Sequence, residues 1–393
     1  MRPVDSASDR SPRPAGPGRR LPRRRLLQQA LLATGSATLG PALLAACRPA
    51  ARGPRRLVIS NWPLYIDPTK DGVPGTVDRF RKQTGINVRY SEDINDSVAF
   101  MAKVQPDLAA GRPIAQDLFV TTYWLAEQLI RVGWADPLPL ANVPNLSRLI
   151  PSLRRPSWDP QGRFTLPWQS GITGIAYNIE ATGRPLTSVD DLFDPRLRGK
   201  VGFLTEMRDT LSLLMMADGK DITRPTYADA EPSFARLEQA KKDGQIRAFT
   251  GNDYQDDLLA GNFAACVAWS GDVAQLAVEQ PKLRFLVPST GSNIWADVMV
   301  MPKGAPNRRE VAEWLNFVYD PEQAARIAAV VNYISPVEGV QEVLASRAAT
   351  APLARNPLMF PDAAMSSRLK VFGPINKKEE ARFDERFAAI TEA

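Results

Sequence analysis

Short segments rich in β-branched residues alternate with amphipathic segments along most of this chain. The expected strands lie at residues 57–61, 86–90, 117–120, 172–177, 200–204, 263–269 and 294–302. Helices are expected over 76–83, within 98–110, over 125–132, from Ser212, over 233–242 and after Asp320. Regular alternation of strands and helices favours an α/β fold with a mostly parallel sheet.

Residues that start and end helices support several of these elements. Gly85 and Gly133 follow two amphipathic segments, and glycine commonly ends a helix because it tolerates positive φ. Residues 320–323 (Asp-Pro-Glu-Gln) place an aspartate at the N-cap and a proline in the first helical position. This pattern predicts a helix start.

The first 47 residues have the pattern of an export signal. Arginines at 23–25 precede an apolar run that is too short to span a bilayer permanently. These arginines resemble the twin-arginine signal of bacteria, and residues 44–47 (Leu-Ala-Ala-Cys) resemble a lipobox. The lipobox resemblance implies that Cys47 is acylated and anchors the protein to the outer face of a membrane. The alternative is an arginine-rich tail without a signal function.

The basic charge of the chain comes from this leader. The whole chain has 49 basic and 43 acidic residues, a net charge of +6. Residues 1–47 contain eight arginines and two acids, which is also a net charge of +6. The part that follows is therefore neutral and has no basic stripe with interleaved aromatic residues, so a nucleic-acid partner is not expected.

The absence of histidine limits the chemistry of the site. It excludes Ser-His-Asp and Cys-His catalysis and the usual histidine-containing zinc and iron sites, so we expect no metal and no cofactor. Carboxylate-only catalysis stays open. Cys266 is the single cysteine after Cys47 and lies in an apolar run, so it should be a buried free thiol.

The roughly 345 residues after Cys47 are enough for two lobes with separate cores. Residues 48–56 are expected to be a tether between the anchor and the folded part. The expected division assigns 57–168 and 272–302 to one lobe, and 169–271 and 303–393 to the other.

Aromatic and acidic residues recur where the expected strands end. In open α/β sheets, ligands bind beyond the carboxyl ends of the strands. The residues at these ends are Trp62, Tyr65, Tyr123, Glu206, Asp209, Trp269, Asp272, Trp295 and Asp297. Each has an alternative interpretation, because tryptophans fill cores and carboxylates cap helices or occupy first turns.

This combination suits an aliphatic chain with ammonium ends. Carboxylates replace the water lost from each charge, and aromatic rings cover the methylene groups and attract the cation. An unpaired buried ammonium would cost several kcal/mol, so the carboxylates should determine affinity.

The chain resembles a known family, the spermidine/putrescine-binding lipoproteins of polyamine ABC importers. The resemblance extends from about residue 57 to 335. The motifs that carry it are Asn61-Trp62-x-x-Tyr65, Val120-Thr121-Thr122-Tyr123-Trp124, Gly174-Ile175-Ala176-Tyr177-Asn178 after Pro167-Trp168, Leu204-Thr205-Glu206-x-x-Asp209, Trp269-x-Gly271-Asp272, Trp295-x-Asp297 and Tyr333-x-Ser335-Pro336.

The resemblance implies a type II periplasmic-binding-protein fold, with two α/β lobes joined by a hinge around a ligand cleft. It implies a monomer that delivers a polyamine to a membrane permease, and a binding function rather than an enzymatic one. An aromatic box would be formed by Trp62, Tyr65, Tyr123, Trp269 and Trp295. Ammonium and imino groups would be bound by Glu206, Asp209, Asp272 and Asp297, with further hydrogen bonds from Thr121 and Tyr333.

The chain departs from the family pattern at one place. Between Trp62 and Tyr65 the family usually has a small hydroxyl residue and an acid, whereas this chain has Pro63 and Leu64. One end of the ligand could therefore be held less tightly than in the family, or be a different chemical group. Two alternatives stay open: another cationic or amino-bearing nutrient, and an exported hydrolase that uses Asp272 and Asp297.

Overall fold

The structure is a computed structural model that describes residues 54–392 of the chain. By their contacts, residues 53–393 form one compact unit. Its sheet has eleven strands, and eight of them follow the order β2-β1-β3-β10-β5-β8-β6-β7. The strands are β1 Arg56–Asn61, β2 Asn87–Glu92, β3 Leu118–Thr122, β4 Ala135–Asp136, β5 Thr165–Asn178, β6 Val201–Leu204, β7 Ile246–Thr250, β8 Ala265–Trp269, β9 Leu283–Leu286, β10 Ser292–Pro302 and β11 Leu369–Lys370.

The first lobe contains the parallel strands β2, β1 and β3. Its helices are α1 Thr76–Thr84, α2 Ser97–Ala109, α3 Tyr123–Val132, α9 Arg308–Val318, α10 Pro321–Val331 and α11 Val340–Ala345. Gly85 ends α1 and Gly133 ends α3, both with φ near 70°, as their positions in the sequence predicted. Asp320 caps α10 by accepting hydrogen bonds from the backbone N–H groups of Glu322 and Gln323, which confirms that helix start.

The second lobe contains the parallel strands β7, β6 and β8, with β9 paired to β5. Its helices are α4 Ile179–Thr182, α5 Met207–Ala217, α6 Tyr227–Lys242, α7 Tyr254–Leu259, α8 Ser270–Glu279 and α13 Lys377–Glu392. α5 begins at Met207, five residues before the predicted start at Ser212. The sequence prediction relied on apolar periodicity, which the polar first turn of this helix lacks.

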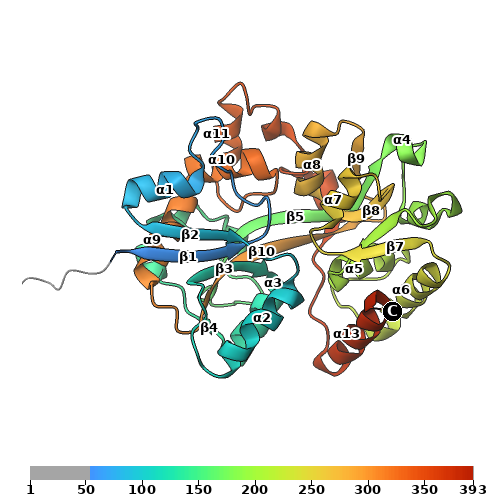
Figure 1. Ribbon diagram of the computed structural model, residues 1–393, viewed down its shortest axis with the longest axis horizontal. Helices are drawn as coiled ribbons and strands as arrows, with labels where there is room; N and C mark the ends of the chain where they lie inside the picture. Colours follow the sequence, from blue (N-terminus) through green and yellow to red (C-terminus); the bar gives the residue numbers. More distant parts are fainter. Residues whose placement is uncertain (1–53, 393) are drawn as a thin grey trace, which may run out of the picture. The chain divides into compact units, whose positions relative to one another are not determined.

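Two long antiparallel strands, β5 and β10, connect the lobes (Figure 1). One half of β10 pairs with β3 of the first lobe, and the far half of β5 pairs with β8 and β9 of the second. After α12 (Ala363–Arg368), the chain pairs with β10 through β11 and reaches α13, which packs on α6. The predicted α/β fold with two lobes joined by a hinge is therefore confirmed. The sheet is mixed rather than mostly parallel, because β10 runs antiparallel to β3 and β5, and β5 runs antiparallel to β8 and β9.

The predicted division into lobes stays a prediction, and the packing of two pairs of elements favours a different assignment for them. α8 packs against β5 and β8, and β9 pairs with β5, so we group both elements with the second lobe. α9 packs against α1 and β1, and α10 packs against α1 and α9, so we group both helices with the first lobe. The predicted division treated the return strand at 294–302 as the last first-lobe element, whereas this grouping keeps the chain in that lobe for two more helices.

Each lobe has its own aromatic core. Phe80 packs edge-on against Trp314 at 5.2 Å in the first lobe, and Phe234 packs against Phe383 at 5.7 Å in the second. Cys266 is fully buried and forms no disulfide, as its apolar surroundings predicted. The export signal at 1–47 and most of the tether at 48–56 lie outside the described residues. Within residues 54–392, no helix is long and apolar enough to cross a membrane.

Candidate ligand-binding site

A cavity with an empty volume of about 540 Å³ lies between the two lobes. Its aromatic lining consists of Trp62, Tyr65, Tyr123, Trp124, Trp269, Trp295 and Tyr333. Its acidic lining consists of Glu206, Asp209, Asp272 and Asp297, and its remaining lining consists of Pro63, Thr122, Arg208, Asn252 and Asn293.

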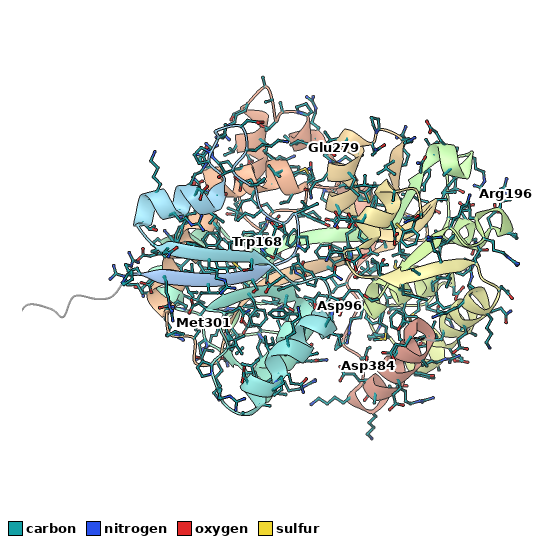
Figure 2. All side chains as sticks on the ribbon, viewed as in Figure 1. Asp96, Trp168, Arg196, Glu279, Met301 and Asp384 are labelled. Atoms are coloured by element: carbon teal, nitrogen blue, oxygen red, sulfur yellow. The ribbon has the colours of Figure 1, made fainter. Side chains whose placement is uncertain are left out.

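Helix starts and a strand irregularity bring these side chains together. Helices α3, α5 and α8 each begin at the cavity, with Asp209 and Asp272 in the first turns of α5 and α8. Asp297 lies on β10 where the pairing with β5 shifts by one residue, so that Trp168 has no partner. Such a bulge redirects neighbouring side chains, and here it occurs beside an acidic lining residue. Figure 2 shows Trp168 near the start of β5.

Asp272 is held by three hydrogen bonds. The Tyr333 hydroxyl donates to one carboxylate oxygen at 2.6 Å, and the Tyr254 hydroxyl and Gln255 amide donate to the other at 2.8 and 3.2 Å. Burial raises the pKa of Asp272 to about 6, and the two tyrosine hydroxyls limit this rise. Asp272 is therefore mostly ionised at pH 7 and is a fixed negative charge in the cavity.

Asp297 and Glu206 lack comparable hydrogen-bond support. Burial, followed by the charges of Asp209 and Asp272, raises the pKa of Asp297 to about 8. The Tyr65 hydroxyl offsets part of this rise without reaching hydrogen-bonding geometry. Burial raises the pKa of Glu206 to about 8 as well. A cation in the cavity would favour the ionised form of both groups.

Both carboxylate oxygens of Asp209 accept hydrogen bonds from protein donors. One oxygen accepts hydrogen bonds from the Thr173 hydroxyl and the Asn293 amide, and the other accepts from the indole N–H of Trp269 at 3.2 Å. Burial raises the pKa of Asp209 despite these donors. Asp209 thus adds negative charge to the site and orients the Trp269 ring.

The aromatic side chains form a continuous series of edge-to-face contacts. Tyr65 contacts Tyr333 at 5.2 Å, Tyr333 contacts Trp295 at 5.4 Å, and Trp295 contacts Trp269 at 6.3 Å between ring centroids. The buried indole N–H groups of Trp62 and Trp295 have no hydrogen-bond partner within the described chain. Buried polar groups normally have partners, so these two donors remain available to a water molecule or to an acceptor atom in the cavity.

Arg208 is the basic residue among the described residues that line the cavity. Its guanidinium carbon lies 4.3 Å from the centre of the Trp124 ring, and its nitrogen lies 3.8 Å from the Glu380 carboxylate of α13. The Trp124 ring and the Glu380 carboxylate thus partly balance the positive charge of Arg208 at one side of the cavity. The carboxylates therefore dominate the charge of the lining.

The structure brings all of the predicted ligand residues to this cavity except Thr121, whose neighbour Thr122 lines it instead. The Tyr123 hydroxyl donates to the backbone oxygen of Phe372, so its ring rather than its hydroxyl is available to cover apolar groups of a ligand. Sequence reasoning missed Trp124, Arg208, Asn252 and Asn293. Trp124 and Arg208 lie inside quoted motifs, but a motif does not show which side chains turn inward.

Pro63 and Leu64 occupy the position at which the sequence departs from the family pattern. Pro63 lines the cavity, whereas Leu64 is 46% exposed and adopts a positive φ of 55°. This backbone conformation is unusual for leucine. Neither residue supplies a charge, so the acidic lining comes from the four carboxylates at or near α5, α8 and β10.

Gly271 is needed for close packing beside Asp272. A Cβ atom at this position would lie 2.5 Å from the Tyr333 ring, which is fixed by its hydrogen bond to Asp272. We therefore expect Gly271→Ala to lower the free energy of unfolding by about 1–3 kcal/mol through overpacking. Urea denaturation followed by tryptophan fluorescence measures this change. Unaltered stability would contradict the close approach of Tyr333.

No group of three or more histidine, cysteine, aspartate or glutamate residues within 54–392 is arranged to hold a metal ion. The buried carboxylates are instead interleaved with aromatic rings, which is an arrangement suited to organic cations. Two lobes around such a cavity define the class of the protein, which is a solute-binding protein of the type II fold.

Comparisons with known proteins agree with this class. Residues 75–361 match the model of the bacterial extracellular solute-binding proteins, and the chain belongs to that family. The putrescine-binding periplasmic protein PotF of Escherichia coli K12 is 29% identical over 338 residues, which cover 80% of this chain and 85% of the relative. The spermidine/putrescine-binding periplasmic protein of the same organism is 24% identical over 335 residues, with coverage of 85% and 89%.

Solved structures show the same fold. The spermidine/putrescine substrate-binding protein PotD of Streptococcus pneumoniae superposes with a TM-score of 0.69 at 24% identity, covering 86% of this chain and 99% of that structure. The Tp0655 lipoprotein of Treponema pallidum has a TM-score of 0.69 at 17% identity, with coverage of 86% and 100%.

Proposed function

We propose that this chain is the extracytoplasmic substrate-binding protein of an ABC importer and that its cavity binds a linear polyamine such as putrescine or spermidine. The observation that carries this proposal is the set of four buried carboxylates interleaved with aromatic rings, at a cavity between two lobes. The names of the similar proteins from Escherichia coli support the same ligand class.

The charges of the site favour a ligand with more than one positive group. Burial raises the pKa of Asp272, Asp297 and Glu206, which means that each ionised form lacks a sufficient counter-charge within the protein. A diammonium ligand would supply these counter-charges. The Trp269 and Trp295 rings would cover the methylene groups between them, and each cation–π contact adds roughly 0.5–2 kcal/mol.

The proposal includes the location and partners of the protein. The resemblance of residues 44–47 to a lipobox supports a lipid anchor on Cys47, with residues 48–56 as a tether. In this arrangement a monomer captures the polyamine outside the cytoplasmic membrane and delivers it to the permease. A mass measurement of the mature protein tests the anchor, because cleavage of the peptide bond before Cys47 would remove the leader and acylation of Cys47 would add the mass of the acyl chains.

Ligand-induced thermal stabilisation tests the ligand class. A ligand that binds the folded state alone stabilises it by mass action, by about 2.7 kcal/mol at 100 times its Kd. We expect the Tm of the purified chain to rise with putrescine and spermidine, and to remain unchanged with 1,4-butanediol, which has the same chain length without charge. A panel of amino acids and other amines covers the alternative of a different amino-bearing nutrient. No shift with either polyamine at millimolar concentration would contradict the proposal.

A further inference from the structure

A loop of the first lobe contacts the second lobe directly beside the cavity. The backbone oxygen of Asn95 accepts hydrogen bonds from the backbone and side-chain N–H groups of Asn252, at 3.3 and 3.1 Å. The Asn95 amide donates to Asp253 at 3.0 Å. Gly251 allows this approach, because a Cβ atom there would lie 2.6 Å from the Asn95 oxygen. Hydrogen bonds therefore link two loops from different lobes at the edge of the cavity.

Asp96 makes a further contact between the lobes, at the residue that precedes the lining carboxylate Glu206. One of its carboxylate oxygens accepts a hydrogen bond from the Thr205 hydroxyl of the second lobe at 2.7 Å. The other accepts from the backbone N–H of Ala99 and caps α2. Thr205 directly precedes Glu206, so this bond brings Asp96 close to a lining carboxylate of the opposite lobe. Figure 2 shows Asp96 at the start of α2, on the side toward the second lobe.

The charge of Asp96 acts on Glu206 across the boundary between the lobes. After burial, Asp96 is the strongest cause of the raised pKa of Glu206, ahead of Asp209. The Ser97 hydroxyl and the Arg208 guanidinium act in the opposite direction. The hydrogen bond to Thr205 thus holds the Asp96 carboxylate beside the residue that precedes Glu206, and one buried carboxylate oxygen of Glu206 has no donor within the described chain.

We propose that Asp96 and Glu206 form a charge-sensing contact that opposes closure of the empty cleft and favours closure when a cation lies beside Glu206. Repulsion between the two carboxylates penalises approach of the lobes. An ammonium group next to Glu206 removes that penalty, and the Thr205–Asp96 hydrogen bond then holds the lobes together. Asp96 is a positioning residue in this scheme, since it does not line the cavity. The cation's identity as a polyamine rests on the proposed function.

The capping role of Asp96 can be separated from its charge. Asparagine is an equally good N-cap and has the size of aspartate, so Asp96→Asn keeps the cap on α2 and a hydrogen bond to Thr205 while removing the charge. Asp93→Asn removes the same charge from an exposed residue of the same loop and is the matched control. Thr205→Val removes the hydrogen bond and leaves both charges in place.

Distances between spin labels on the two lobes measure closure directly. Exposed residues on α2 and α13 carry the labels through Lys103→Cys and Glu385→Cys, in full-length protein with Cys47→Ser. At pH 9, where Glu206 is mostly ionised, we expect Asp96→Asn to at least double the closed fraction without ligand. Asp93→Asn should behave as the unaltered protein does. Thr205→Val should reduce the closed fraction both with and without putrescine.

The outcomes distinguish this inference from the proposed function. Equal closed fractions for Asp96→Asn and Asp93→Asn without ligand would overturn the charge-sensing contact, even if putrescine binds. A lower closed fraction in Asp96→Asn would overturn it too, because Asp96 would then only stabilise the closed form through its hydrogen bond to Thr205. A raised closed fraction in a protein that binds no polyamine would support the contact and contradict the proposed ligand.

Discussion

Asp272→Asn should raise the Kd for putrescine about 100-fold, which corresponds to about 3 kcal/mol of binding free energy. Asp272 is the lining carboxylate that is most firmly held, with hydrogen bonds from Tyr333, Tyr254 and Gln255. It is also mostly ionised at pH 7, because its pKa is about 6. Asparagine keeps the size of the side chain but leaves a ligand ammonium without its counter-charge in a buried site. Isothermal titration calorimetry measures this loss.

Two control variants show whether the loss comes from the charge. Asp256→Asn removes a charge from an exposed position on the neighbouring helix α7 and should leave the Kd unchanged. Trp62→Phe keeps most of the ring area and should raise the Kd about tenfold or less. Comparable losses from Asp272→Asn and Trp62→Phe would mean that the charges are not the main source of affinity.

Polyamine binding should strengthen by about 100-fold between pH 6 and pH 8. The pKa values of Asp297 and Glu206 are both about 8 without ligand, so both groups are mostly protonated at pH 6. A ligand ammonium paired with one of these two groups favours its ionised form, and binding at that group therefore releases one proton. Release of one proton makes the affinity rise about tenfold for each pH unit below the pKa of the free protein. Titration in buffers of different ionisation enthalpy counts the protons released.

The raised pKa values of Asp297 and Glu206 also determine how the free energy of unfolding of the ligand-free protein depends on pH. Carboxyl groups have a pKa of about 4 in an unfolded chain, so the folded state binds more protons than the unfolded state between about pH 4 and pH 8. The stability contributed by Asp297 and Glu206 is therefore fully present below about pH 4 and is lost progressively as the pH rises from 4 to about 8. Thermal stabilisation by putrescine should be larger at pH 8.5 than at pH 6. Combining Asp297→Asn with Glu206→Gln should flatten this dependence, and a pH-independent Kd in the unaltered protein would contradict it.

The fold could be predicted because local signals agreed with the tertiary structure. Gly85, Gly133 and Asp320 ended or started helices where the sequence indicated, and the apolar strand segments form the sheet. The return of α9 and α10 to the first lobe was not predictable, since their amphipathic patterns do not show which surface each one covers. The start of α5 at Met207 was missed because its first turn is polar.

The site was predictable to the extent that it lies at strand ends. Trp269 and Asp272 lie at and just after the end of β8, and Glu206 follows β6. Ligands of α/β sheets bind beyond the carboxyl ends of the strands, and this rule predicted that these side chains lie at one site. Asp96 and Arg208 could not be found in this way. In the sequence, Asp96 has only the pattern of a helix N-cap. Its second contact, with Thr205, forms only where the two lobes meet. Arg208 lies near Glu380 of the last helix, a partner so distant in sequence that no local pattern indicates it.

Calorimetric titration of the purified chain at pH 8 with putrescine and with 1,4-butanediol, which has the same length without charge, tests the central claim most directly. If buried carboxylates and aromatic rings bind a linear organic cation, putrescine should bind with a micromolar or lower Kd and the diol should give no binding heat. Equal binding of both compounds, or binding of neither, would contradict the claim.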